Sequence, residues 1–233
     1  MSEPVPAKLI IAIDGPAGAG KSTIASRLAR KLGYVNLESG ALYRALALKA
    51  IQCDASFDDE AALLELVRKS QMKLEPSLGG NRVLLDGRDV TQRIRDEDVS
   101  QAASRVSVHP KIREWMVTRL REFGREGGIV MEGRDIATKV FPNADVKIFL
   151  DADPVIRQRR RIQQQSSRGA SAEAMAAELR ERDRRDRTRQ DSPLVPAEGS
   201  AILDSTALSE EEVLRRLEEL VAEKLKTARL RYA

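Results

Sequence analysis

The sequence predicts an α/β domain built around a parallel sheet. Five short runs have the composition of buried strands, at residues 9–13, 34–37, 128–131, 146–150 and 201–203. Several are apolar at consecutive positions, as expected for parallel strands that are covered on both faces. Helical patterns lie between the runs, and strands that alternate with helices favour a parallel arrangement.

Length and composition fit one domain, 1–233, with insertions. Hydrophobic residues make up 42% of the chain and charged residues 33%, and the net charge of +4 suits an anionic small substrate as well as weak contact with nucleic acid. Cys53 and His109 are the only cysteine and histidine, which argues against an internal disulfide, a zinc cluster and a Ser-His-Asp triad. The polar N-terminus and the short first apolar run lead us to expect a cytoplasmic protein with no membrane segment.

The first predicted strand leads into a phosphate-binding loop. The stretch DGPAGAGKST, residues 14–23, fits the pattern G-x-x-x-x-G-K-[ST] and opens a helical pattern at 21–32. Its glycines allow backbone amides and the helix N-terminus to surround a polyphosphate. Lys21 adds positive charge at the outer phosphates, and the Ser22 hydroxyl is suited to bind Mg²⁺. We expect the Lys21 side chain to face solvent.

About ninety residues separate the second predicted strand from the third, and we expect them to form an inserted subdomain over about 41–108. Residues 71–90 within it predict a hairpin with a Gly-Gly-Asn turn at 79–81, which is the wrong geometry for a simple crossover. A helix predicted at 109–123 then leads to the third strand, with Pro110 suited to its first turn.

Polar residues follow the second and third predicted strands. Ser39 begins a turn onto a helix that carries Arg44, and Arg134 and Asp135 follow the third strand. Ligands of open α/β sheets bind outside the carboxyl ends of the strands, so two arginines there suggest a second anion beside the triphosphate. The alternative is that Arg44 pairs with a surface carboxylate and Arg134 with Asp135.

The fourth strand ends at Asp151, roughly where a motor or helicase would place its metal-binding acid. This pattern alone does not exclude such a machine, but a chain of 233 residues with two small inserts is short for one. A GTPase is disfavoured because the chain has no N-K-x-D sequence.

An arginine-rich stretch, ELRERDRRDRTR at 178–189, lies in an excursion at about 154–197 that is flanked by prolines. We interpret the excursion as a lid that closes over a phosphoryl group, because the planar guanidinium binds phosphate oxygens with two donors. A loop tip is predicted at 163–171. At 100° per residue, one side of the helix carries Arg182, Arg185, Asp186 and Arg189.

The acids of this stretch are spaced to hold its arginines at i,i+4, for example Asp183 with Arg187 and Arg182 with Asp186. The alternative is a solvated helix with surface ion pairs. The last strand, 201–203, is followed by a helix at 209–230 that begins with a capping box, Ser209 and Glu212.

No candidate general base stands out in the sequence, and this helps to identify the chemical class of the phosphoryl acceptor. An alcohol would benefit from a carboxylate that takes its proton, whereas a phosphate monoester, with a second pKa near 6, is already a nucleophile. An arginine-rich site therefore favours a phosphate acceptor such as a nucleoside monophosphate.

Several segments in order, IDGPAGAGKST, ESGALYR, EGRDI, VFPNADVKIFLDA, ERDRRDRTR with SPLVPA, and ILDST, resemble bacterial cytidylate kinases over nearly the whole chain. The resemblance implies a P-loop kinase core with a five-stranded parallel sheet flanked by helices, a monophosphate-binding insert and a helical lid. It also implies transfer of the γ-phosphoryl group of ATP to CMP or dCMP with Mg²⁺.

The resemblance further implies roles for individual residues. Lys21, Arg134, Arg182 and Arg189 would be catalytic, and Ser22 would bind the metal. ATP would be bound by Gly15, Pro16, Ala17, Gly18, Ala19, Gly20, Lys21, Ser22 and Thr23. Ser39, Ser104, Arg113 and Asp135 would surround the cytosine, Arg44, Arg134 and Arg189 would hold the CMP phosphate, and Arg182 and Asp186 would reach the sugar and the phosphates.

Two positions depart from the family pattern. Glu38 stands where Asp is usual, which adds a methylene near the acceptor site, and Ala137 stands where Gly is usual, which stiffens the turn after the third strand. Neither departure removes a charge from the expected chemistry.

Two other functions remain open at this point. One is a different monophosphate kinase, and the other is a P-loop module that binds nucleic acid through the arginine helix. Aromatic residues make up only 3% of the chain, so stacking platforms are scarce and we expect no nucleic-acid partner. We expect a monomer, because no sustained apolar heptad is present.

Overall fold

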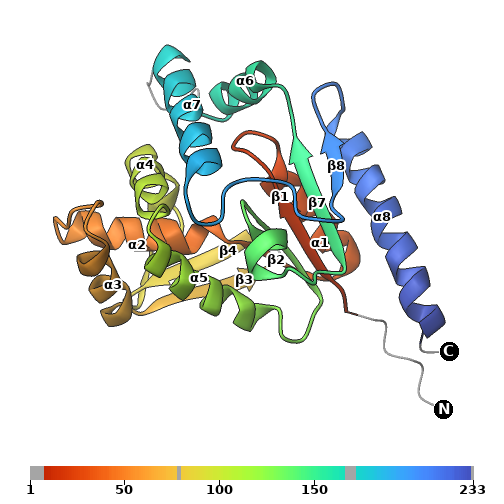
Figure 1. Ribbon diagram of the computed structural model, residues 1–233, viewed down its shortest axis with the longest axis horizontal. Helices are drawn as coiled ribbons and strands as arrows, with labels where there is room; N and C mark the ends of the chain where they lie inside the picture. The colour runs from red at the N-terminus through yellow and green to blue at the C-terminus, as the bar shows by residue number, and fades with distance from the viewer. Residues whose placement is uncertain (1–7, 78–79, 166–171, 232–233) are drawn as a thin grey trace.

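The computed structural model describes residues 8–77, 80–165 and 172–231. Its centre is a parallel sheet in the order β2-β6-β1-β7-β8 (Figure 1). The five strands are β1 (Ile10–Asp14), β2 (Val35–Glu38), β6 (Ile129–Gly133), β7 (Val146–Asp151) and β8 (Ala201–Asp204). The five predicted strands and their parallel arrangement are therefore confirmed, each within two residues of the predicted ends.

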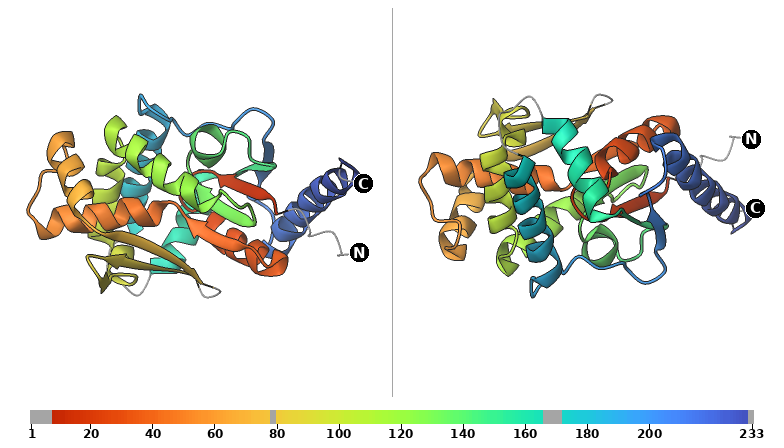
Figure 2. Two further views of the ribbon diagram at one scale, coloured as in Figure 1. Left: turned by 90° about the horizontal axis from the view of Figure 1, so that it is seen from below. Right: turned by 90° about the horizontal axis from the view of Figure 1, so that it is seen from above.

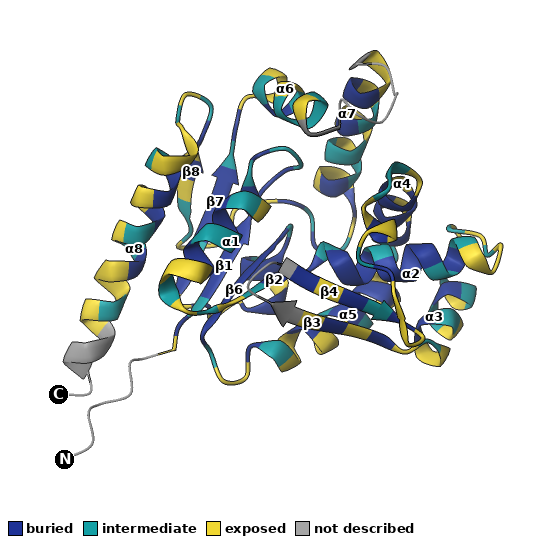
Figure 3. Ribbon diagram, turned by 180° about the vertical axis from the view of Figure 1, so that it is seen from behind, coloured by how far each residue is buried: buried dark blue, intermediate teal, exposed yellow. Residues whose placement is uncertain are grey.

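Both faces of the sheet are covered, which explains the consecutive apolar residues. In β1, Ile11 and Ile13 face one core cluster, whereas Ala12 between them faces the other. The first cluster is closed by α1 (Lys21–Leu32) and α8 (Glu210–Arg231). Figure 3 shows the buried strands of the sheet beside α8, whose outer side is exposed.

The predicted helix boundaries follow local signals. The backbone N–H and hydroxyl of Ser209 donate to Glu212 Oε2, both at 2.8 Å, so the expected capping box of α8 is confirmed. Pro110 occupies the first turn of α5 (Pro110–Phe123), as predicted. In the described part of the chain, no helix has the length and apolar character needed to cross a membrane.

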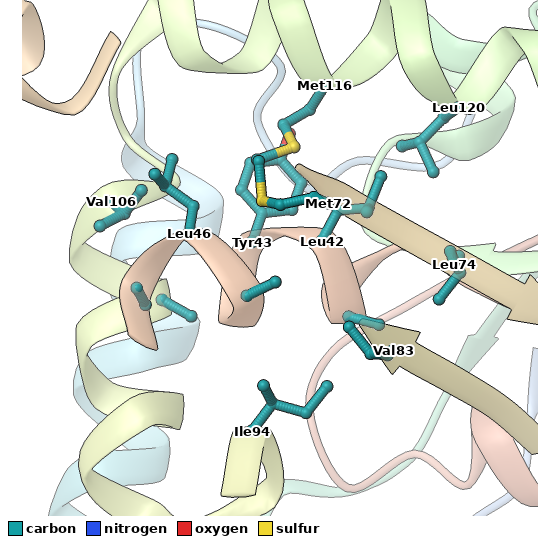
Figure 4. Close-up of a cluster of buried hydrophobic side chains, with 14 of the residues drawn as sticks. Leu42, Tyr43, Leu46, Met72, Leu74, Val83, Ile94, Val106, Met116 and Leu120 are labelled. Carbon is teal, nitrogen blue, oxygen red and sulfur yellow. The ribbon is translucent and has the colours of Figure 1, made fainter. Parts of the chain in front are cut away.

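The chain between β2 and α5 forms a lobe at the opposite end of the molecule from α8 (Figure 2). Its elements are α2 (Gly40–Gln52), α3 (Glu60–Lys69), β3 (Met72–Ser77), β4 (Gly80–Leu85), β5 (Arg88–Asp89), the 3-10 turn η1 (Arg93–Arg95) and α4 (Glu97–Val106). The lobe shares one apolar core with the sheet. Leu42 and Leu46 of α2 lie at its centre, between α5, the hairpin and α4 (Figure 4).

The predicted hairpin is present as β3 and β4, and the short β5 adds a third strand that the sequence did not indicate. Residues 78–79, at the tip of the predicted turn, lie outside the described residues. The assignment of Asn81 to that turn is wrong, because Asn81 lies in β4 and is buried. Its amide donates to the Asn36 carbonyl at 2.6 Å and accepts from the Glu38 N–H at 2.8 Å, which fastens the hairpin to β2.

The excursion after β7 consists of α6 (Pro154–Gln165) and α7 (Ala172–Thr188). α6 leaves from the carboxyl end of β7, and α7 runs back toward α4 (Figure 1). The loop tip predicted at 163–171 is wrong in its first part, because α6 continues to Gln165. Residues 166–171 lie outside the described residues.

Candidate active site at the carboxyl edge of the sheet

A cavity of about 480 Å³ opens where β1, β2 and β6 end, between the lobe and the α6–α7 excursion. Gly15, Pro16 and Ala19 are not among its lining residues. The other expected site residues line it together: Ala17, Gly18, Gly20, Lys21, Ser22, Thr23, Ser39, Arg44, Ser104, Arg113, Arg134, Asp135, Arg182, Asp186 and Arg189. Residues that are far apart in sequence thus converge on one space.

The loop after β1 has the backbone that an anion-binding loop needs. Gly15 has φ 152°, and a Cβ there would lie 2.0 Å from the Leu150 carbonyl oxygen, so only glycine fits. Gly20 precedes α1 without a side-chain cap, and the first turn of α1 has no acid. The N-terminal amides of α1 therefore remain available to a phosphate.

The expectation that Lys21 faces solvent is wrong. The side chain is buried, and its Nζ donates to the Pro16 carbonyl at 2.7 Å. Burial lowers the pKa of Lys21 to about 7, assisted by the positive charges of Arg134 and Arg182 and opposed by Glu132 and Asp14. Lys21 is thus held inside a positive cavity, where an incoming polyanion would restore its charge.

The acid beside the loop is Glu132, which our sequence reasoning did not single out. Its Oε1 accepts a 2.7 Å hydrogen bond from the Ser22 hydroxyl. Burial, and then the charge of Glu38 on the neighbouring strand, raises the pKa of Glu132. Asp151, which lies roughly where a motor or helicase would place its metal-binding acid, does not line the cavity. The position of Glu132 at the carboxyl end of the third predicted strand could have identified it.

One wall of the cavity carries an ion pair between Arg113 of α5 and Asp135 after β6. Both side chains are buried, although the sequence offers no local motif that would distinguish Arg113 from a helix-surface residue. The Arg113 guanidinium also lies 5.6 Å from the Tyr43 ring centre. Beside this pair, the buried Ser104 hydroxyl has no hydrogen-bond partner. A neutral donor or acceptor is thus presented next to a charged pair.

Arg44 forms an ion pair with Glu38 at 2.6 Å. A pair between Arg44 and a carboxylate is the alternative that the sequence left open, but this carboxylate lies in the cavity wall instead of on the outer surface. Burial opposes the charge of Glu38, but Arg44 outweighs it and holds the pKa of Glu38 below its ordinary value. The Nε of Arg44 remains without a partner. The guanidinium therefore keeps a free donor while it is held in place.

The alternative of an Arg134–Asp135 pair is not what the structure contains. Arg134 Nε binds Asp186 at 2.8 Å, and Asp186 also lies 3.6 Å from Arg189. Burial and the nearby Arg134 lower the pKa of Arg182 to about 10. Three arginines therefore share one buried carboxylate, and positive charge remains in excess.

The predicted i,i+4 pair of Asp183 with Arg187 is wrong, whereas Arg182 and Asp186 do interact, because the charge of Arg182 helps to lower the pKa of Asp186. Asp183 binds Arg157 of α6 at 2.5 Å, whereas Arg187 lies 3.8 Å from Asp151. Arg157 also donates to the Ala17 carbonyl at 3.0 Å, so it joins α6, α7 and the phosphate loop. Asp183 and Asp186 thus bind arginines outside the helix and fix its orientation over the loop.

The predicted side of α7 is confirmed in part. Arg182, Asp186 and Arg189 line the cavity, but Arg189 follows the helix and Arg185 is not among the lining residues. Arg184 is exposed and paired with Glu181, as expected for a different side. Sequence reasoning also missed lining residues without a local motif, namely Arg95, Arg161, Ser100, Ser107 and Ala103.

Comparisons with known proteins agree with this geometry. A family model described as Cytidylate kinase matches residues 11–223. A cytidylate kinase from Geobacillus kaustophilus (strain HTA426) is 47% identical over 94% of this chain and 98% of its own length. One from Pasteurella multocida (strain Pm70) is 45% identical over 89% of this chain and 92% of its own.

Among solved structures, an uncharacterized protein from Eubacterium ventriosum ATCC 27560 superposes with a TM-score of 0.52 at 13% identity. The match covers 93% of this chain and 99% of that chain, and it shows a shared fold alone.

We expect ATP binding to be coupled to protonation of Lys21. Because the pKa of Lys21 is about 7 before binding, the phosphates should raise it, and ATP should take up about one proton on binding at pH 8 and far less at pH 6. Titration calorimetry in two buffers of different ionisation enthalpy, without metal, measures this uptake. Lys21→Met should abolish it, and a binding enthalpy at pH 8 that is independent of the buffer would contradict the expectation.

Proposed function

The chain belongs to the cytidylate kinase family and transfers the γ-phosphoryl group of ATP to CMP or dCMP, and from this premise we propose how its side chains divide the work. ATP occupies the side of the cavity formed by the loop from Gly15 to Thr23, with its outer phosphates at Lys21. The monophosphate occupies the side formed by the lobe. The single observation that carries this assignment is the mutually repelling cluster of the buried Lys21 and the partly buried Arg134 and Arg182, whose excess positive charge a polyanion would neutralise.

The cytosine is read by the wall that carries Asp135, Arg113, Ser104 and Ser39. Cytosine offers an amino donor at C4, which suits a carboxylate, and acceptors at N3 and O2, which suit guanidinium and hydroxyl donors. The unpartnered Ser104 hydroxyl supports this role, because a buried polar group without a partner is costly unless a ligand satisfies it. Uracil lacks the amino donor and would leave the Asp135 carboxylate without that contact.

The CMP phosphate is the nucleophile. One of its oxygens attacks the γ-phosphorus of ATP, and the bond from that phosphorus to the bridging oxygen of ADP breaks. A phosphate dianion needs no general base, so the protein must position the reactants and stabilise negative charge. We assign Arg44, Arg134 and Arg189 to the CMP phosphate, and Arg182 and Asp186 to the sugar and the transferring group.

Mg²⁺ is implied by this chemistry, and the residues present fit it. Ser22 offers a hydroxyl, and Glu132 lies at hydrogen-bond distance from it, suited to orient a metal-bound water. The described residues contain no cluster of three or more His, Cys, Asp or Glu that would form a complete protein cage. Mg²⁺ is usually held by one or two protein groups together with phosphates and waters. When bound, it would offset the negative charge of the phosphates.

We also propose that residues 41–108 form the monophosphate-binding subdomain and that 154–197 form a lid that closes over both nucleotides. The contacts of Arg157 with Asp183 and with the Ala17 carbonyl support the lid, because they couple α7 to the ATP loop. The protein would act as a monomer in the cytoplasm, in pyrimidine nucleotide metabolism. Nucleic acid is not a proposed partner, since Arg182 and Arg189 face the cavity.

The function is tested by coupled ADP release with CMP, dCMP, UMP, AMP, GMP and dTMP as acceptors. We expect CMP and dCMP to give the highest kcat/KM, because cytosine is the pyrimidine of this set whose amino group can donate to Asp135. Equal rates with UMP would contradict the assignment of Asp135 to the amino group of cytosine. Steep salt-dependent binding to oligonucleotides without turnover would instead favour a nucleic-acid module.

Asp135→Ala should weaken CMP binding far more than ATP binding. A hydrogen bond that involves a charged group contributes about 1.5–3 kcal/mol, and the proposed ATP position lies at the phosphate loop instead of at this wall. The matched control is Asp191→Ala, which removes a carboxylate 3.6 Å from Arg113 that does not line the cavity. Equilibrium titrations with each nucleotide, with thermal melts to check folding, would refute the assignment if CMP affinity were unchanged or ATP affinity fell equally.

Arg189→Lys should retain the fold and net charge but lose turnover. Lysine lacks the planar fork, and a phosphate contact used in the transition state is worth roughly 2–4 kcal/mol, or tens- to thousand-fold in rate. The control is Arg184→Lys, whose exposed pair with Glu181 is worth about 0–1 kcal/mol. Equal, small losses of kcat at both positions would mean that the stretch only solvates the surface.

A further inference from the structure

Asp14, the last residue of β1, is a buried carboxylate that the proposed chemistry does not use. Its side chain is 2% exposed, and neither oxygen is free. Oδ1 accepts from the Ile136 N–H at 2.8 Å, and Oδ2 accepts from the Ala137 N–H at 2.7 Å. Although Asp14 directly precedes the ATP loop, its side chain therefore acts on the segment that follows β6.

That segment is the short π-helix η2 (Ile136–Val140), whose first amides require acceptors. In most helices the N-cap side chain supplies one. Here the N-cap residue is Asp135, and its carboxylate makes no capping hydrogen bond. It binds Arg113 instead, and Asp14 from a different strand accepts from the η2 amides.

We propose that Asp14 is a positioning residue for the acceptor site, because it caps η2 in place of Asp135 and thereby leaves the Asp135 carboxylate for Arg113 and the cytosine. The proposal rests on the role of Asp135 given above. If Asp14 did not accept from these amides, Asp135 at the N-cap position would be the residue placed to do so, and its carboxylate would be drawn away from the base. Asp14 acts on the substrate only through Asp135.

Contacts of the surrounding backbone restrict the conformation of the turn that follows β6. Asp14 pairs with Gly133 in the sheet register, so its side chain is fixed relative to the end of β6. At Gly133, a Cβ would lie 2.5 Å from Ser39 Oγ, so β6 already approaches the lobe closely. The Asp135 carbonyl accepts from the Lys139 N–H at 2.8 Å, which fixes its backbone while its side chain stays in the cavity.

Ionisation of Asp14 is unfavourable in this buried position, which indicates that the residue serves the geometry of the turn after β6. Burial raises the pKa of Asp14 to about 7, aided by Asp135, against the two amide donors and Lys21, which lower it. A folded-state pKa above the ordinary value of 3.8 means that the folded state binds a proton that the unfolded state releases. Stability is therefore lost as the pH rises through this range, and ionised Asp14 does not stabilise the fold.

Asp14→Asn tests the proposal, because asparagine keeps one acceptor and replaces the other with a donor that faces an amide. We expect CMP affinity to fall about ten-fold, equal to about 1.4 kcal/mol, with less than about two-fold change in ATP affinity. The difference in Tm between variant and wild type should shift in favour of the variant from pH 6 to pH 8, because only the wild type carries the carboxylate.

The matched control is Asp145→Asn. Asp145 Oδ2 accepts from the Ile10 N–H at 2.8 Å, so it is also a carboxylate bonded to the backbone of a sheet residue, but it is exposed and does not line the cavity. We expect this variant to keep wild-type affinity for both nucleotides.

Equal losses for ATP and CMP in Asp14→Asn would show that Asp14 supports the ATP loop or the fold as a whole, and unchanged CMP affinity would also overturn the proposal. If Asp135→Ala weakens CMP but Asp14→Asn does not, the positioning role fails and the role of Asp135 stands. If Asp14→Asn does not fold, amide hydrogen exchange of the wild type answers the question: CMP should slow exchange at Ile136 and Ala137 more than ATP does. Equal slowing by ATP alone would refute the coupling.

Discussion

Buried positive charge is the constraint on which the rest of this structure depends. Lys21, Arg113, Arg134 and Arg189 are all largely withdrawn from water around one cavity, and desolvation of a cation is expensive without partners. The arginines are held by carboxylates and Lys21 by the Pro16 carbonyl, and these partners do not neutralise the cluster. Asp186, for example, contacts two of these arginines, Arg134 and Arg189. The remaining excess charge is what a pair of nucleotides would offset.

The same constraint explains where the chain places its acids. Asp183 and Asp186 on α7 bind Arg157 and Arg134, which belong to α6 and the sheet edge, so the excursion is oriented by ion pairs as well as by apolar contact. At surface positions such pairs contribute little, but buried pairs with good geometry specify which groups meet. The arginine-rich stretch is therefore part of the wall of the cavity, and its exposed members, such as Arg184, form the solvated side.

Helix ends in this protein are capped either by neighbouring residues or by residues that are distant in sequence. Ser209 and Glu212 cap α8 within its first turn, and the sequence predicts this capping box because the two residues lie three positions apart. Asp14 and η2 satisfy the same requirement across 122 residues, so no local pattern indicates it. Asn81 is comparable, because its amide joins β4 to the edge of a different sheet. In each case the backbone groups had to be satisfied, but only folding decided which side chain would do so.

The sequence by itself determined the strands, the parallel sheet, the phosphate loop and the residue types at the carboxyl edge, because periodicity, glycine spacing and helix signals are local. The resemblance of its motifs was sufficient to indicate the family. Only the tertiary structure decided that Lys21 is buried, that Glu132 and not Asp151 lies beside Ser22, and that Asp135 pairs with Arg113 and not with Arg134. These outcomes depend on burial and on contacts between distant segments, where desolvation fixes both the partner and the pKa of each charge.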